Sequence, residues 1–532
     1  MSRPSHHAGT FGLVLAGLRR DRVRIGMWVA GITAMVGVSA QSVQTLFPTQ
    51  ADLDAAAASS DNPAIVAFQG PAYGLDTVGG QVAFQIGAPG LVLVGLMALL
   101  QTGRLTRTEE EAGRLELVRS LPVGRHAPTL AAGILVGAMC AAVGLLTTLA
   151  LVALDLPVAG SICFGLGYAA VGAVFMAITL VTAQISENPR VANGLAGLVL
   201  GASFILRAVG DAGENALSWL SPIGWSQQAR PFADERWWPL LISFGVASVL
   251  LVVATKLEDH RDLGAGLLAP KAGPARAAPR LSSPFALALR LQRGSVAAWA
   301  GGTAALALVY GGLTSAIESF IDDNPQLEDF FTQSGGDVAD ITSSYLATSA
   351  QVTALIGSGY VIQSVLRLRS EETRERTEPV LATATSRWRY WLGHLTVAVG
   401  GALVVLVASG LVLGISAAAV MGDVSLVADG FAAVVAYFPA VLVMAGVPAL
   451  TVGLFPKYAA AAWGLLLVTF VVSFFGTLLD LPGWVLAISP FDHVALVPVE
   501  QLSLGPVVAL CVVAAVLFVV GAASYRRRDI PV

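Results

Sequence analysis

The chain has 532 residues, of which 55% are hydrophobic and only 12% are charged, and its formal net charge is −4. Soluble domains average about 25% charged residues, so the composition excludes an ordinary soluble protein, and we expect no nucleic-acid partner. Many uncharged runs approach the roughly 20 residues that a helix needs to cross a bilayer. The short alternating strands of outer-membrane barrels are absent. The composition therefore predicts an all-α polytopic membrane protein.

The uncharged runs predict about twelve transmembrane helices, at 25–46, 82–102, 128–154, 158–186, 191–206, 237–255, 296–316, 341–366, 390–421, 430–456, 458–479 and 504–525. An arginine-rich, partly apolar segment, residues 10–24, precedes the first run and predicts a helix that lies in the membrane interface. The fifth run stops at Arg207, which we place in an outer loop.

The basic residues predict the orientation of the chain. If the N-terminus lies inside and the spans alternate, all but three of the 31 Lys and Arg residues fall on the inner side. The exceptions are Arg207, Arg230 and Arg236. Positive residues concentrate on the cytoplasmic side of membrane proteins. We therefore expect a multi-pass protein of the plasma (inner) membrane, with cytoplasmic N- and C-termini.

Residues 263–284, rich in Ala, Gly and Pro, predict a flexible cytoplasmic linker at the middle of the chain. The plan of the first half, residues 1–262, then restarts in the second half, residues 285–532. For example, arginines precede Trp28 in one half and Trp299 in the other. Each half has six spans, and this even number predicts two parallel, pseudo-symmetric six-helix halves.

The two most charged stretches, residues 107–125 and 369–387, occupy the same place in the two halves. They align at one offset (369 − 107 = 262), which pairs Arg107 with Arg369 and Arg125 with Arg387. A solvated loop that obeys the positive-inside rule explains the arginines but not the glutamates. We therefore interpret both stretches as docking surfaces for an ATP-driven partner. The predicted coupling residues are Glu109, Glu110, Glu111, Arg114, Glu116, Glu371, Glu372, Arg376 and Glu378.

Each charged stretch predicts a short helix that ends before a proline, Pro122 or Pro379. Pro379 directly follows Glu378, whereas Pro122 comes six residues after Glu116 (122 − 116 = 6). We therefore expect the second helix to stop earlier than the first.

Two apolar, Trp-containing segments, 207–236 and 480–503, precede the last span of each half. They predict short helices that dip into the outer leaflet with Trp at the interface. The alternative is an ordinary aromatic belt with a loop.

This arrangement resembles the permeases of ABC transporters, and most closely the actinobacterial type with both halves fused, associated with export of polyketide antibiotics such as tetronasin. The resemblance covers essentially the whole chain, and its sharpest part is residues 109–125, which are similar to that family's coupling helix. It implies multidrug efflux or antibiotic resistance, driven by a separate ATP-binding-cassette ATPase, expected as a homodimer. The second copy departs from the pattern at Thr373, Arg374 and Pro379.

No ATP site is predicted in the chain itself, because G-x-x-x-x-G-K-[ST] and even the dipeptide Gly-Lys are absent. We expect no enzymatic activity, no catalytic or metal-binding residue and no cofactor in this chain, with ATP and magnesium bound by the partner.

Polar and aromatic residues within spans two, five, eight and eleven are candidates for the transport path, because polar residues within spans usually face the bundle interior or a cavity and because the resemblance implies a central cavity at these spans. The alternative is that these residues only pack helices together. The candidates are Gln85, Asn193, Tyr345, Gln351, Ser358, Gln363, Ser473, Phe474 and Phe475. No charged residue lies in the middle of a predicted span, which favours a bulky, apolar substrate. The alternative function is a twelve-span secondary transporter of hydrophobic compounds, but it predicts carboxylates within spans.

Overall fold

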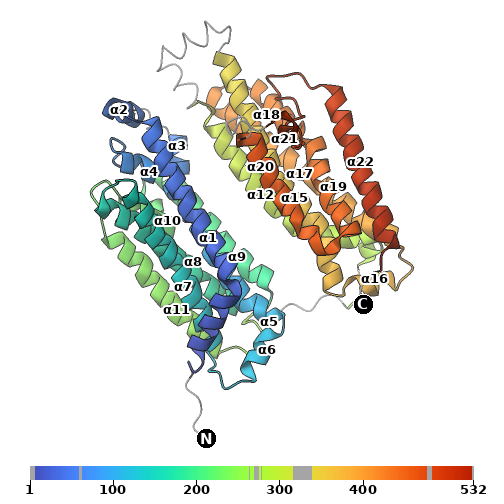
Figure 1. Ribbon diagram of the computed structural model, residues 1–532, viewed down its shortest axis with the longest axis horizontal. Helices are drawn as coiled ribbons and strands as arrows, with labels where there is room; N and C mark the ends of the chain where they lie inside the picture. The colour runs from blue at the N-terminus through green and yellow to red at the C-terminus, as the bar shows by residue number, and fades with distance from the viewer. Residues whose placement is uncertain are drawn as a thin grey trace. The chain divides into compact units, whose positions relative to one another are not determined.

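The computed structural model describes residues 6–58, 63–262, 264–268, 275–276, 278–315, 338–475 and 482–529 (Figure 1). Within these ranges all regular secondary structure is helical. Ten helices are long and apolar enough to cross a membrane. The predicted all-α polytopic membrane fold is therefore confirmed. The chain divides into two compact units, Met1–Gly273 and Pro274–Val532, with the boundary inside the segment 263–284.

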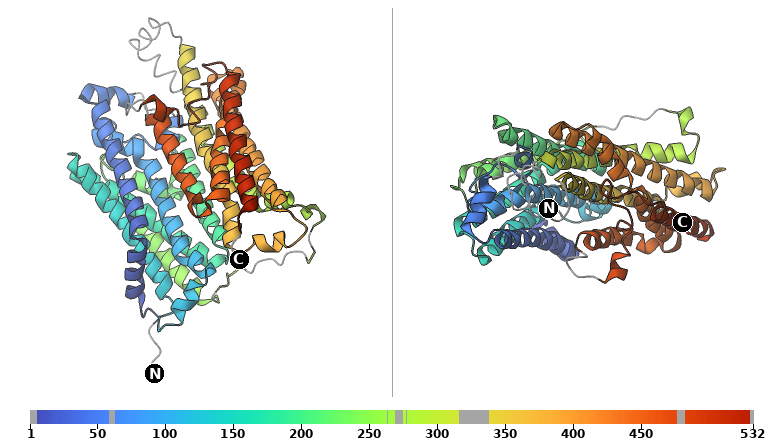
Figure 2. Two further views of the ribbon diagram at one scale, coloured as in Figure 1. Left: turned by 45° about the vertical axis from the view of Figure 1, so that its right-hand side comes forward. Right: turned by 90° about the horizontal axis from the view of Figure 1, so that it is seen from above.

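The first unit is a bundle of long helices with short helices between them (Figures 1 and 2). Its long helices are α1 (Thr10–Leu46), α4 (Val78–Gly103), α7 (Ala127–Ala153), α8 (Val158–Ile185), α9 (Pro189–Ala212) and α11 (Trp238–Asp259). Its short elements are α2 (Gln50–Ala58), α3 (Pro63–Gln69), the π-helix η1 (Arg104–Thr108), α5 (Glu109–Glu111), α6 (Arg114–Arg119), the 3₁₀ helix η2 (Ala216–Leu220) and α10 (Pro222–Gln228).

The second unit repeats this order of helices. Its long helices are α12 (Pro284–Gly312), α15 (Val338–Thr373), α17 (Arg387–Met421), α19 (Phe438–Leu454), α20 (Ala462–Phe475) and α22 (Leu504–Arg527). Its shorter elements are η3 (Pro279–Leu281), α16 (Thr377–Leu381), α18 (Ser425–Val435), η4 (Pro456–Ala461) and α21 (Gly483–Leu486).

Corresponding helices also pack against corresponding neighbours in the two units. In the first unit α1 packs on α4 and α7, and α8 packs on α4, α7 and α11. In the second, α12 packs on α15 and α17, α17 packs on α18, and α19 packs on α15 and α22. The helix α8 of the first unit thus corresponds to α18 and α19 together. Each unit buries its own apolar core, around Met97 and Phe175 in the first and around Trp391 and Met444 in the second.

Local sequence explains where several of these helices begin. Ser283 caps α12 and Ser386 caps α17, each accepting a hydrogen bond from a backbone N–H of the first turn. Proline stands in the first turn of α9, α10 and α12, where its missing N–H would have no partner within the helix.

Within the described residues the twelve predicted spans fall on helices, but two of these helices do not meet the criteria of length and apolarity for a membrane span. α12 and α15 are long, with 29 and 36 residues, but neither is among the ten helices that qualify. The number twelve therefore stays a prediction.

Two expected boundaries are wrong. Residues 10–24 do not form a separate interfacial helix, because they continue into the first span as the single 37-residue helix α1. The fifth span does not end at Arg207, because α9 continues to Ala212. Arg207 is fully buried there and lies 3.7 Å from the Asp211 carboxylate, one helical turn later. This neighbour lets the helix carry a charge where the sequence alone indicated a loop.

The beginning of the predicted linker is ordered against the first unit. The backbone N–H groups of Leu267 and Leu268 donate to the carbonyls of Gln184 and Ile185, at the end of α8. The expectation of a flexible linker is therefore wrong for residues 264–268, because these backbone groups have partners.

Candidate coupling sites at the charged segments

The charged segment of each unit begins as the extension of a long helix and then breaks at the same position. α4 continues through the π-helix η1 into α5, which ends at Glu111, and α15 continues to Thr373. The chain then takes a left-handed conformation at Gly113, with φ of 71°, and at Glu375, with φ of 57°. These two residues correspond at the repeat offset (375 − 113 = 262).

The short helices after the break have almost equal extents. α6 ends at Arg119, before Pro122 as expected, and α16 ends at Leu381, the corresponding position (381 − 119 = 262). The expectation that the second helix stops earlier is therefore wrong. Pro379 lies in the first turn of α16, where a helix does not need the missing N–H.

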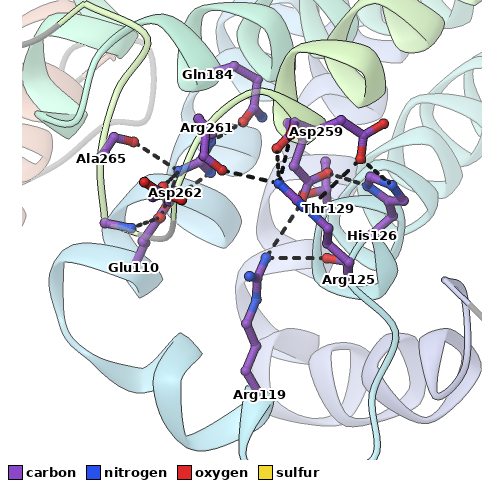
Figure 3. A network of polar contacts seen from close by, with 12 residues as sticks. Glu110, Arg119, Arg125, His126, Thr129, Gln184, Asp259, Arg261, Asp262 and Ala265 are labelled. Atoms are coloured by element: carbon purple, nitrogen blue, oxygen red, sulfur yellow. Dashed lines mark hydrogen bonds and ion pairs between the residues drawn. The ribbon is translucent and has the colours of Figure 1, made fainter. Parts of the chain in front are cut away.

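In the first unit, Glu110 stands at the centre of a buried ion-pair network (Figure 3). Arg261, just after α11, donates from Nη1 to Glu110 Oε1 at 2.8 Å and from Nη2 to Oε2 at 3.1 Å. Arg107 also donates to Oε2, at 3.0 Å. The side chains of Glu110, Arg107 and Arg261 are 6%, 1% and 7% exposed. Two arginines thus neutralise one buried carboxylate, which joins the end of α11 to the charged segment.

Glu372 has the same environment in the second unit. Arg369 donates to its Oε2 at 3.2 Å, as Arg107 does to Glu110. Arg528, just after α22, forms an ion pair with its Oε1, as Arg261 does with Glu110. The Glu372 side chain is 1% exposed. The two units therefore contain the same arrangement, built from different parts of the chain.

A second pair of arginines binds the end of the last helix in each unit. Arg125 Nη2 donates to the backbone carbonyls of Glu258, Asp259 and Arg261, at 2.8 to 3.1 Å. Arg387 Nη1 donates to the carbonyls of Arg526 and Arg528, at 3.2 and 2.7 Å. The last carbonyls of a helix lack partners in a following turn, and these arginines donate to carbonyls at that end and just after it.

The first unit adds a cluster around the Glu258 side chain, which is 3% exposed (Figure 3). Its carboxylate lies 3.0 Å from both His126 Nδ1 and Thr129 Oγ1, and 3.7 Å from Arg119 Nη2. These contacts fasten the C-terminal turn of α11 to the start of α7 and to the end of α6.

The predicted coupling residues fall into a buried and an exposed group. Glu371, like Glu110 and Glu372, is buried, and it forms an ion pair with Arg367 at 3.2 Å. Glu109 is 14% exposed and accepts a hydrogen bond from Arg114 at 2.7 Å, which raises the pKa of the Arg114 guanidinium. The exposed group comprises Glu111, Arg114, Glu116, Arg376 and Glu378. The docking role of the whole set stays a prediction, and a partner can reach only this exposed group directly.

The sequence is similar to those of known transport proteins. Residues 281–526 match the family described as multidrug efflux system permease Rv1217c, C-terminal domain. Over 535 aligned residues the chain is 38% identical to the multidrug efflux system permease protein Rv1217c of Mycobacterium tuberculosis. The match covers 99% of this chain and 96% of the relative. The chain belongs to the family of multidrug efflux system permeases. The predicted resemblance to a permease is thereby confirmed.

The transport-path candidates in the first unit of this permease contact neighbouring helices. Gln85 is exposed on α4 and accepts a hydrogen bond from Ser39 of α1 at 3.1 Å. Asn193 of α9 packs against Gly103 of α4, where a Cβ atom would lie 1.9 Å from Asn193 Oδ1. Asn193 Oδ1 is buried without a hydrogen-bond partner. Both residues lie at helix contacts.

In the second unit, two of the candidates on α15 lie on the same side of the helix. Tyr345 and Gln363 are 18 residues apart (363 − 345 = 18), about five helical turns, and both face α12. The Tyr345 hydroxyl donates to the Tyr310 carbonyl at 2.9 Å, and Gln363 Oε1 accepts from Trp299 Nε1 at 2.6 Å.

The remaining candidates are placed as follows. Ser358 is fully buried and its hydroxyl donates to the Ala354 carbonyl of its own helix, while Gln351 is half-buried. Ser473 lies 2.8 Å from both the Ser489 hydroxyl and the Asp492 carboxylate. The side chains of Phe474 and Phe475 lie outside the described residues. Whether these residues form one path stays a prediction.

The segments before the last spans contain short helices where they are described. In the first unit Ser221 caps α10 by accepting from two N–H groups, and Trp219 stacks on Trp238 with ring centroids 5.0 Å apart. In the second, Ser489 Oγ accepts from the Phe491 N–H at 3.2 Å. Their depth in a membrane stays a prediction.

Sequence reasoning missed Arg261 and Arg528, which it counted only as inner positive charges. A signal was available, because the dipeptide Arg-Asp stands within two residues of the end of the last helix in each unit, as Arg261-Asp262 and Arg528-Asp529. The signal is short, and its meaning depends on Glu110 and Glu372, more than 150 residues away in the sequence.

Proposed function

We propose that this permease is the transmembrane subunit of an ABC exporter that moves bulky, apolar compounds out of the cell. A separate ATPase, acting as a homodimer, would bind ATP and magnesium and place one subunit on each charged segment. The N- and C-termini and both segments would then lie on the cytoplasmic side of the plasma membrane.

The observation that carries this proposal is the repetition of the charged segment at one end of each bundle. The break at Gly113 and Glu375, the buried carboxylates and the arginines around them recur at corresponding positions. A homodimer with two-fold symmetry carries two identical binding surfaces, so it needs two equivalent sites on the permease. The name of the Mycobacterium tuberculosis relative supports the multidrug efflux part of the proposal.

The part of each segment offered to the partner is the exposed face of the short helix. In the first unit it includes Glu116 and Leu117 of α6 and, two residues after that helix, Leu121, with the two leucines 72% and 60% exposed. On α16 it includes Glu378 and Pro379. Apolar side chains ringed by charge are typical of protein interfaces.

The test is a pair of charge reversals on these faces, Glu116→Arg with Glu378→Arg, in the chain expressed together with the ATPase. We expect the double variant to insert into the membrane normally but to retain much less ATPase during purification. Asp76→Arg, an exposed acid before α4, is the matched control and should retain the wild-type amount. Undiminished recovery of the ATPase by the double variant would contradict docking at these helices.

The energy source separates this function from secondary transport. Drug efflux by cells that contain the permease should stop when the ATPase gene is deleted, and should continue when an ionophore collapses ion gradients. Efflux that survives deletion of the ATPase and stops with the ionophore would establish the secondary transporter instead.

A further inference from the structure

The last long helix of each unit is joined to the charged segment at two points. One point is the ion pair of Arg261 with Glu110, or of Arg528 with Glu372. The other is the set of bonds from Arg125, or Arg387, to the carbonyls at the end of the same helix. We call each pair of contacts an arginine latch.

The latches recur although their surroundings differ. In the first unit the Glu258 carboxylate contacts His126 and Thr129. Glu258 stands three residues before Arg261, and the residue three before Arg528 is Tyr525, a buried aromatic residue with no carboxylate. Each unit nevertheless contains two latch arginines and one buried glutamate. The positive-inside rule accounts for arginines at this end of a helix, but it does not require them to be buried on a glutamate.

The geometry of the ion pair makes it a stiff connection. The guanidinium of Arg261 binds both oxygens of Glu110, and such bidentate, charge-assisted bonds fix orientation as well as distance. Both side chains are almost completely buried, so water does not compete for the contact. A displacement of the charged segment therefore moves the end of the last helix with it.

The last helices can pass such a movement into the bundle. α11 packs along α8, and α22 packs along α19. α8 and α19 in turn pack on α4 and α15, the helices that lead into the charged segments. The last helix, its neighbour and the charged segment thus form a closed set of contacts in each unit.

We propose that Arg261 and Arg528 are positioning residues that couple the charged segments to the last helices, α11 and α22, so that movement imposed by the ATPase reaches the transport bundle. This proposal rests on the function proposed above. It separates two roles within one segment, because the exposed faces of α6 and α16 would bind the partner while the buried latches would transmit its movement.

The first latch has an additional support. The Gly264 N–H donates to Glu110 Oε1 at 2.7 Å, and the Ala265 carbonyl accepts from Arg107 and Arg261 at 3.1 and 3.0 Å. The first residues after α11 therefore close over the ion pair, and we expect loss of the first latch to have the larger effect.

The experiment compares Arg261→Gln, Arg528→Gln and the double variant in the full chain with its ATPase. Three quantities are measured, namely the ATPase recovered with the permease, ATP hydrolysis by the complex, and drug efflux. We expect normal recovery and continued hydrolysis, with efflux in the double variant lowered by about tenfold, which corresponds to about 1.4 kcal/mol. Arg290→Gln, which removes an exposed arginine of α12, is the control and should leave all three unchanged.

A charge exchange distinguishes transmission from simple loss of structure. Glu110→Arg combined with Arg261→Glu restores an ion pair, Arg107→Gln is added so that two buried arginines do not meet, and we expect this triple variant to recover part of the efflux that Arg261→Gln combined with Arg107→Gln loses. If the glutamine variants fail to accumulate in the membrane, Arg261→Lys and Arg528→Lys replace them, since lysine keeps the charge but lacks the planar guanidinium, with which Arg261 binds both oxygens of Glu110.

Two outcomes would overturn the latches. Wild-type efflux in a well-assembled double variant would show that no movement passes through them, and loss of the ATPase from that variant would make them part of the docking surface. Failure of the wild-type permease itself to retain the ATPase would instead refute the proposed function.

Discussion

At the scale of single residues, the break between α5 and α6 depends on the left-handed backbone of Gly113. A side chain in this conformation costs roughly 1–2 kcal/mol, and a Cβ atom here would meet nothing within 4 Å, so the backbone alone decides the effect. We expect Gly113→Ala to lower the free energy of unfolding by about 1 kcal/mol. The melting temperature of the detergent-solubilised protein measures this change.

A glycine in a helix provides the opposite control. Gly294 lies inside α12, is exposed and also has open space around its position for a Cβ atom. Gly294→Ala should raise stability by up to about 1 kcal/mol, because alanine favours the helix. A loss of stability in Gly294→Ala equal to that in Gly113→Ala would contradict the backbone explanation.

The buried pair of Arg207 and Asp211 gives a second prediction at this scale. The two side chains are 0% and 2% exposed, so removing one leaves the other charge buried without its partner. We expect Arg207→Met to lower stability by about 3–5 kcal/mol. The double variant Arg207→Met with Asp211→Leu should be markedly more stable than Arg207→Met alone, and equal melting temperatures would show that the pair is not coupled.

At the scale of helices, glycines set how closely equivalent pairs approach. A Cβ atom on Gly165 of α8 would lie 2.3 Å from the Gly144 carbonyl oxygen of α7, and one on Gly430 of α18 would lie 2.6 Å from Gly414 Cα of α17. Small residues allow this close backbone contact between membrane helices. The two units therefore use the same kind of contact at the same helix pair.

This contact predicts that bulk at the crossing is not tolerated. We expect Gly165→Val and Gly430→Val each to reduce the amount of folded protein recovered in detergent, because backbone atoms cannot move aside as side chains can. Gly201→Val, at a position of α9 with nothing within 4 Å, is the control and should have little effect. Normal yields of both crossing variants would show that the helices can separate without loss of the fold.

At the scale of the whole molecule, the proposed docking of a dimeric ATPase on α6 and α16 would be bivalent. When both contacts form together, the second occurs at high effective concentration. We therefore expect Glu116→Arg or Glu378→Arg alone to lower ATPase recovery modestly, and the double variant to lower it by more than the product of the two single effects. Titration of the ATPase against each purified permease measures this, and independent effects would contradict bivalent docking.

The sequence by itself determined the class of the protein and its duplication. Composition and uncharged runs require membrane helices, because a bilayer accepts few charges and leaves no backbone group unpaired. The offset between the two charged stretches also predicted that they correspond, and the breaks at Gly113 and Glu375 follow that offset. Local patterns gave the wrong helix boundary at Arg207 and at Pro379. Arg207 lies inside a helix because Asp211 pairs with its buried charge. Pro379 lies inside a helix because it stands in the first turn, where its missing N–H is not needed.

Only the tertiary structure decided what the glutamates of these segments do. The sequence presents Glu109, Glu110 and Glu111 as three neighbouring acids in one exposed surface. In the folded unit Glu110 is buried on Arg261, whereas Glu111 remains exposed. Arg261 comes from the far end of the same half, and the free energy of pairing a buried charge depends on the groups around it in space. No local pattern encodes that neighbour, so the arginine latches became visible only when the last helix of each unit was in place.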